Sequence, residues 1–132
     1  MRFVTRDTDY GIRALIYMAK LKGGTATVDE MALKGKLPKV FLRRILQKLA
    51  EKKILSSYKG KSGGFALLSD PGKLRLTDVM KAFQGDIDLT NCLLKGDICP
   101  NKKTCRLRKK IKAINLMVIK ELDKITLKSL VI

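Results

Sequence analysis

Hydrophobic residues in the first half of the chain recur at helical spacing in three successive segments. The first segment, residues 8–24, ends at two glycines and predicts a helix whose apolar positions are Ile12, Leu15, Ile16 and Ala19. Thr27 and Glu30 have the spacing of a capping box, so a short helix is predicted over residues 28–35. Pro38 suits the first turn of a third helix, predicted over residues 37–53.

The third predicted helix separates its apolar and basic residues onto different faces. Its apolar stripe consists of Phe41, Leu42, Ile45, Leu46 and Leu49. Basic residues occupy much of the remaining surface, and no acidic residue occurs between Lys36 and Ala50. Three helices with a tight second connection have the order of a helix-turn-helix, which makes this helix the predicted recognition helix.

Two short runs typical of β-strands follow, at residues 54–59 and 65–70, on either side of the glycine-rich segment "GKSGG". Glycine permits the positive φ angles of a tight turn, so the pattern predicts a hairpin with Lys59 and Lys61 at its tip. A helix-turn-helix followed by a basic hairpin is a winged helix. Leu76, Thr77 and Asp78 then open a brief helix, with Thr77 as its predicted N-cap.

The last predicted helix runs from about Asn101 to Lys124 and has one narrow apolar seam. The seam consists of Leu107, Ile111, Ile114, Val118, Leu122 and Ile125. Such a seam is typical of pairing with a second copy of the chain, and the alternative is that it packs back onto its own domain. The expected fold class is therefore mostly α with a small β-hairpin wing. We expect a winged helix-turn-helix domain (residues 1–84), a cysteine-containing loop (85–105), and a long C-terminal dimerisation helix with its tail (106–132).

Charge narrows the choice of partner. The chain has 29 lysines and arginines against 12 acids, a formal net charge of +17. Such an excess attracts polyanions, chiefly nucleic acid and secondly an anionic membrane, although it is also compatible with a merely solvated basic surface. The apolar runs are too short for a membrane span, and the first residues lack the pattern of a secretory signal. We therefore expect a cytoplasmic protein.

The three cysteines, Cys92, Cys99 and Cys105, all lie within one polar segment. Their odd number argues against a disulfide framework, and soft thiolates favour an iron–sulfur cluster or zinc. Zinc usually takes four ligands with closely paired cysteines, and this chain has neither such a pair nor any histidine. Pro100, directly after Cys99, is typical of iron–sulfur ligation. A fourth ligand would come from another residue, solvent or a partner subunit; the alternative is three inert thiols.

Residues on the exposed side of the recognition helix are the candidates for contact with DNA. Arg43 and Arg44 lie near its start, where arginine can bind guanine with two hydrogen bonds. Lys39, Lys48 and Arg6 are predicted phosphate contacts, while Lys59 and Lys61 of the wing are predicted to enter the minor groove. Val40 shares the exposed side and completes the predicted set.

The segments "TDYGIRAL", "LPKVFLRRILQKL" and "GKSGGFAL", together with the three-cysteine loop, resemble the Rrf-type regulators, which include IscR, NsrR and CymR. The resemblance covers nearly the whole chain and implies a homodimeric winged-helix regulator with long C-terminal helices. Members with cysteines in this loop commonly bind an iron–sulfur cluster. The chain departs from the family pattern in having Lys53 for a glycine, Lys59 for an arginine and Arg108 for a histidine. The last difference excludes the histidine-ligated 2Fe–2S site.

In NsrR-like relatives a carboxylate near the start of the first helix of the partner subunit completes the cluster, and by position this implies Asp9. Asp7 is the weaker candidate. The alternative for Asp9 is a helix-start acid that interacts favourably with the helix dipole. An oxygen ligand is more easily displaced than thiolate, which would leave one iron accessible to oxygen, nitric oxide or peroxide.

The expected function is regulation of transcription through a pseudo-palindromic duplex operator. An iron–sulfur cluster (2Fe–2S or 4Fe–4S), which isolated protein can lose, would sense redox state, nitric oxide or iron–sulfur status. One alternative is a cluster-free member controlled by thiol oxidation or a protein partner, as in CymR-like relatives. A more distant alternative is an RNA-binding winged helix, disfavoured because aromatic residues make up only 5% of the chain. An enzyme is not expected, since a cysteine nucleophile would lack the usual histidine base.

Overall fold

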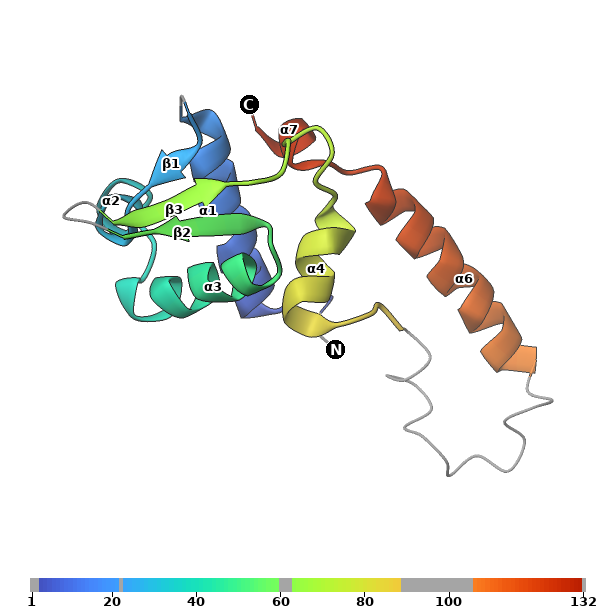
Figure 1. The fold of residues 1–132 in the computed structure, drawn as a ribbon. Coiled ribbons are helices and arrows are strands. Elements are labelled where there is room, and N and C mark those ends of the chain that lie inside the picture. Colours follow the sequence, from blue (N-terminus) through green and yellow to red (C-terminus); the bar gives the residue numbers. More distant parts are fainter. Residues whose placement is uncertain (1–2, 22, 60–62, 89–105, 132) are drawn as a thin grey trace.

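The computed structural model describes residues 3–21, 23–59, 63–88 and 106–131 (Figure 1). Its helices and strands are α1 (Arg6–Lys20), β1 (Thr25–Ala26), α2 (Val28–Lys34), α3 (Lys39–Glu51), β2 (Leu55–Tyr58), β3 (Gly64–Leu67), α4 (Leu76–Gln84), α6 (Arg106–Asp123) and α7 (Leu127–Leu130). The predicted mostly helical fold with a small β-hairpin is confirmed. Within the described residues, no helix combines the length and hydropathy that crossing a membrane requires.

Side-chain caps fix where the first helices begin. The Thr5 hydroxyl accepts a hydrogen bond from the Thr8 amide at 3.3 Å, so α1 starts two residues before the predicted segment. The Thr27 hydroxyl accepts from the Glu30 amide at 3.1 Å, as the capping-box pattern predicted for α2. Pro38, which precedes the first residue of α3, occupies the N-cap position.

The prediction that Thr77 caps the fourth helix is wrong. Arg75 is the N-cap residue of α4, and its amide donates to Asp78 Oδ2 at 3.0 Å. Thr77 lies inside the helix and is 3% exposed, with its hydroxyl donating to Asp123 Oδ1 of α6 at 2.6 Å. A buried hydroxyl needs such a partner, and here it joins α4 to the C-terminal helix.

The sheet has three antiparallel strands in the order β1-β3-β2. The predicted hairpin is present as β2 and β3, with Ser57 opposite Phe65. The two-residue strand β1 was not predicted, and it pairs with the other edge of β3 through Ala26. Gly64 allows this pairing, because a Cβ at that position would lie 2.5 Å from the Ala26 carbonyl oxygen.

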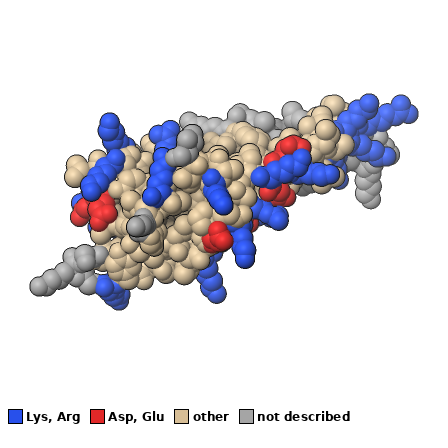
Figure 2. Space-filling view, turned by 90° about the horizontal axis from the view of Figure 1, so that it is seen from above, with Lys and Arg blue, Asp and Glu red and all other residues tan. Residues whose placement is uncertain are grey.

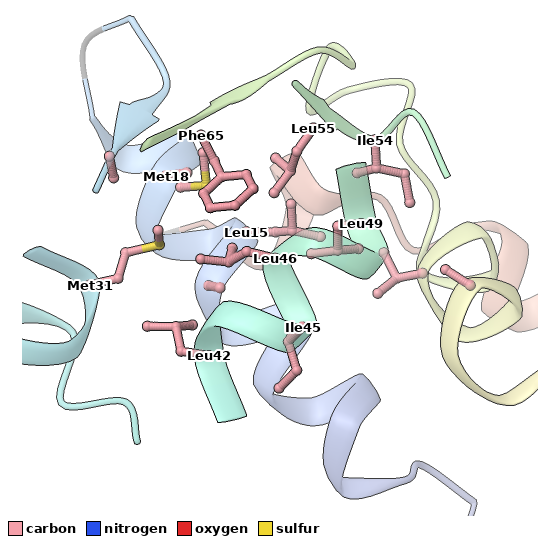
Figure 3. Close-up of a cluster of buried hydrophobic side chains, with 14 of the residues drawn as sticks. Leu15, Met18, Met31, Leu42, Ile45, Leu46, Leu49, Ile54, Leu55 and Phe65 are labelled. Carbon is pink, nitrogen blue, oxygen red and sulfur yellow. The ribbon is translucent and has the colours of Figure 1, made fainter. Parts of the chain in front are cut away.

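The core lies between the sheet, α1 and α3 (Figure 3). The apolar stripe predicted for the third helix is buried except for Phe41, which lies half-buried at its edge. From α1 the core receives Ala14, Leu15 and Met18, all with no exposed surface. Burial of these helix faces against the sheet is the main source of stability for so small a domain.

Helix α3 ends in a backbone conformation that normally selects glycine. Lys53 has φ of 61°, in the left-handed region, and its amide donates to the Ala50 carbonyl at 3.0 Å. The next amide, of Ile54, donates to the Leu49 carbonyl at 3.0 Å. The chain therefore turns into β2 through a lysine at the position where the Rrf-type pattern has glycine.

Helix α6 extends away from the winged domain (Figure 1). Its predicted seam is divided: Leu122 is 8% exposed and packs near α4, whereas Leu107 and Ile114 are 61% and 47% exposed. Leu116 and Met117 of the same helix are also exposed. Several large apolar side chains of this helix therefore remain exposed to solvent in the single chain.

Candidate nucleic-acid interface

The residues predicted on the outer side of the recognition helix are all exposed. They are Lys39, Val40, Arg43, Arg44 and Lys48, and Val40 has 85% of its surface accessible. The buried stripe of the same helix lies against the core, so its amphipathic pattern turns these five side chains outward. A helix with one face held by the core and a basic opposite face has the shape that fits a DNA major groove.

Positive charge alone does not locate this interface. Figure 2 shows lysine and arginine side chains spread over the face seen from above, with a further group at the end formed by α6 and few acidic side chains. The cations described in the first half of α6 are Arg106, Arg108, Lys109, Lys110 and Lys112. The geometry of particular side chains must therefore distinguish a DNA-contacting face from a solvated one.

Two of the predicted cations are held by carboxylates from other helices. Lys39 Nζ lies 2.6 Å from Asp29 Oδ1 of α2, and Arg44 Nη2 donates to Asp7 Oδ1 of α1 at 3.0 Å. The hydrogen bond and charge of Lys39, with a smaller effect of Arg43, hold the pKa of Asp29 below the ordinary range of an aspartate. Neither pair could be predicted from local patterns, because both acids lie outside the acid-free stretch of the recognition helix.

The ring of Phe41 contacts two arginines, one from α1 and one from α3. The guanidinium of Arg6 lies 5.2 Å from the centre of the Phe41 ring, and that of Arg44 lies 5.6 Å from it. Tyr10 stacks on the same ring, with 6.4 Å between the centroids. Arginine is attracted to the negative face of an aromatic ring. Phe41, predicted as a core residue, thus brings Arg6 of α1 close to Arg44 of α3.

The wing is described only in part. Lys59 follows β2 and is exposed, whereas Lys61 lies outside the described residues. The three predicted metal ligands Cys92, Cys99 and Cys105 also lie outside them. In the part of the chain that the structure covers, no three acidic, cysteine or histidine side chains are grouped so as to hold a metal.

Asp9, the predicted fourth ligand, lies in the first turn of α1 with its side chain 45% exposed. Its Oδ2 pairs with Arg13 Nε at 3.1 Å, one helical turn along. The carboxylate borders an open concavity of the surface, with Phe3, Val4, Thr5, Arg6, Tyr10 and Arg13. The Asp9 carboxylate is therefore partly accessible from outside the chain.

Gln84, the last residue of α4, forms hydrogen bonds with residues at the start of α1 and just before it. Its Oε1 accepts from the Thr5 amide at 3.1 Å and from the Thr8 hydroxyl at 2.9 Å. Its Nε2 donates to the Phe3 carbonyl at 3.0 Å. Gln84 was not among the predicted residues, since nothing in the local pattern around position 84 indicates partners 76 and 79 residues away.

Comparisons with known proteins agree over nearly the whole chain. A family model, "Rrf2: Iron-dependent Transcriptional regulator", matches residues 4–132. An rrf2-like HTH-type transcriptional regulator of Rhodobacter capsulatus is 26% identical over 136 residues, which cover 96% of this chain and 91% of that protein.

Two solved structures have a similar fold. CymR (YrzC), the global cysteine regulator of B. subtilis, has a TM-score of 0.73 at 23% identity, with 98% of this chain and 96% of that chain covered. IscR of T. potens has a TM-score of 0.71 at 19% identity, with 98% and 85% covered. At these identities the two likenesses establish the winged-helix fold and nothing finer.

Proposed function

The chain belongs to the Rrf2 family of transcriptional regulators, and from this membership we propose that it binds a duplex operator as a homodimer under the control of an iron–sulfur cluster. As a member of this family it is a DNA-binding regulator and not an enzyme. The single observation that best supports the proposed mode of binding is the outward basic face of α3, where five exposed residues stand opposite a buried stripe.

We assign base contacts to Arg43 and Arg44 near the start of α3, and an apolar contact with a thymine methyl group to Val40. Lys39, Lys48 and Arg6 bind phosphates on either side of the groove. Lys59 and Lys61 of the wing reach the adjacent minor groove. This division follows from chemistry, since arginine can bind guanine in a bidentate manner, whereas lysine acts as a point charge.

The homodimer is supported by the apolar surface that α6 leaves exposed. Leu107, Ile114 and Met117 are 61%, 47% and 66% exposed, which is costly for large apolar residues on a single helix. Pairing of two α6 helices (residues 106–123) would bury them and place two winged domains (1–84) side by side. Two related half-sites in a pseudo-palindromic operator follow from this symmetry.

The proposed cluster site lies in the loop of residues 85–105, with Cys92, Cys99 and Cys105 of one copy and Asp9 of the second copy as ligands. The donor set fits, because three thiolates favour iron–sulfur chemistry and the fourth, oxygen ligand leaves one iron exchangeable. The family's description as iron-dependent supports the same assignment. A bound cluster would supply a centre that oxygen or nitric oxide can modify, and Asp9 would hold it across the two subunits.

Anaerobic purification tests this proposal. We expect a brown protein with iron and sulfide in comparable amounts, and loss of operator affinity or specificity when the cluster is removed. Asp9→Asn should shorten the lifetime of the cluster, while Asp29→Asn, an exposed acid on α2, should not change it. An unchanged spectrum and lifetime in Asp9→Asn would remove Asp9 from the ligand set.

The alternative within the family is a regulator without a cluster, controlled by thiol oxidation or a protein partner. Similarity of fold does not distinguish a cluster-binding regulator from a cluster-free one, because the TM-scores to CymR and IscR are nearly equal, at 0.73 and 0.71. A colourless, iron-free protein that binds its operator, and that releases it when the cysteines are oxidised, would establish this alternative. Equal binding to structured RNA and duplex DNA at matched salt would contradict the DNA-binding assignment itself.

A further inference from the structure

Two side chains hold Arg44 before any DNA is present, Asp7 and Phe41. Asp7 Oδ1 accepts from Arg44 Nη2 at 3.0 Å, and the Phe41 ring lies 5.6 Å from the same guanidinium. Arg6 approaches the ring at 5.2 Å, so the space around Phe41 is shared between two arginines. The Arg44 side chain nevertheless remains 62% exposed and Asp7 42% exposed, which leaves the pair accessible to a DNA groove.

Asp7 is itself fixed by the beginning of α1. The Thr5 hydroxyl caps this helix, and Gln84 binds the Thr5 amide at 3.1 Å and the Thr8 hydroxyl at 2.9 Å. Thr8, next to Asp7 in the chain, has no exposed surface. The carboxylate therefore projects from a helical turn that is bound to α4, and its position relative to α3 is set by two other helices.

A carboxylate on a DNA-contacting face repels phosphate, so it weakens binding unless it improves the geometry of another contact. An arginine that is already oriented loses less conformational entropy when it binds guanine. This lower cost applies only to a base that the oriented guanidinium can reach, so orientation increases the preference for that base. We propose that Asp7 is a positioning residue that orients Arg44 and thereby sets the base preference at the position that Arg44 contacts. This inference rests on the proposed role of Arg44 in base contact.

The test compares Asp7→Asn with wild type on three probes at one salt concentration. The probes are a duplex selected from a random library by the wild-type protein, variants of that duplex changed one base pair at a time, and random duplex. We expect the ratio of selected to random affinity to fall about tenfold, equivalent to about 1.4 kcal/mol. The loss should concentrate at one base pair per half-site, and Asp7→Glu should restore part of it.

Asp29→Asn is the matched control, because it removes the same charge beside the predicted phosphate contact Lys39. It should strengthen binding to all duplexes by a similar factor and leave the ratio unchanged. Asp7→Asn should fold normally, since exposed ion pairs contribute little to stability. Its thermal unfolding, compared with that of Asp29→Asn, verifies this.

Two results would overturn the inference. If Asp7→Asn behaves like Asp29→Asn, Asp7 acts only through its charge; if the ratio of selected to random affinity rises, Asp7 blocks Arg44 instead of orienting it.

The variant Arg44→Ala separates these failures from failure of the proposed function. If Arg44→Ala leaves the ratio intact, Arg44 does not contact a base, whereas if it lowers the ratio and Asp7→Asn does not, only the positioning role is lost. In the double variant, Asp7→Asn should cause no further loss of discrimination.

Discussion

Replacing Gln84 by methionine should destabilise the domain by about 2 kcal/mol, because methionine keeps most of the side-chain volume and removes all three hydrogen bonds at this site. The Thr8 hydroxyl is fully buried, but Thr5 Oγ1 lies 2.9 Å away and can accept its proton. Its lost bond therefore costs about 1 kcal/mol, near the lower limit for a buried donor. The Thr5 amide and Phe3 carbonyl are nearer solvent, so the loss of each of their hydrogen bonds to Gln84 costs about 0.5 kcal/mol.

Urea unfolding at 25 °C measures this free energy, and a thermal melt should show a midpoint lower by about 6–10 °C for a chain of this size. Gln47→Ala is the control, since Gln47 is an exposed glutamine on α3 and its loss should change the unfolding free energy by less than about 0.5 kcal/mol. Amide hydrogen exchange should quicken mainly at the start of α1. If Gln84→Met unfolds like Gln47→Ala, the hydrogen bonds to Thr5 and Thr8 do not hold α1 against α4.

Lys53→Gly should stabilise the protein by up to about 1 kcal/mol in urea unfolding, because the residue is exposed and has φ of 61°. Lys52→Gly, where φ is −84°, should destabilise it. If Lys53→Gly is instead less stable than Lys52→Gly, the backbone at Lys53 is not strained. Asp29 should titrate below the ordinary aspartate pKa in an NMR titration, and Lys39→Ala should remove most of this shift, leaving the smaller effect of Arg43. The stabilisation from that pair is present above the ordinary pKa and is lost as pH falls through the lowered one. Ile114→Asp should convert the dimer to monomer in ultracentrifugation, whereas Leu33→Asp, at an 80% exposed position on α2, should not; a dimeric Ile114→Asp would exclude the seam as the interface.

The elements of this fold could largely be predicted because each depends on local patterns. The periodic apolar residues of α1 and α3, the Thr27 cap and the glycine-rich hairpin are short-range signals. Strand β1 was missed because two residues, Thr25 and Ala26, are too few to show alternation, and they become a strand only through pairing with β3. Thr77 was misassigned for a similar reason: a threonine near a helix start resembles a cap, and its actual partner, Asp123, lies 46 residues away.

For the candidate site, the sequence predicted which residues of each helix are exposed, but not the contacts between residues of different helices. The amphipathic pattern of α3 indicates which residues are exposed, but not which side chains of other helices lie opposite them. The Asp7–Arg44 pair joins residues 37 positions apart, and no periodicity within either helix indicates it. The same holds for Phe41, whose place in an apolar stripe gave no reason to expect contact with Arg6 and Arg44.

The two carboxylates at the start of α1 face different surfaces, and this gives the short segment a particular importance. Residues two positions apart in an α-helix are separated by about 200° around its axis. Asp7 accordingly contacts Arg44 of α3, whereas Asp9 pairs with Arg13 and borders an open concavity. Both belong to the turn that Gln84 binds to α4, so a ligand that displaced the backbone of this turn through Asp9 would also move Asp7 relative to Arg44. On the proposed function, ligation of a cluster in the second subunit and base contact by Arg44 would thus depend on the position of the same helical turn.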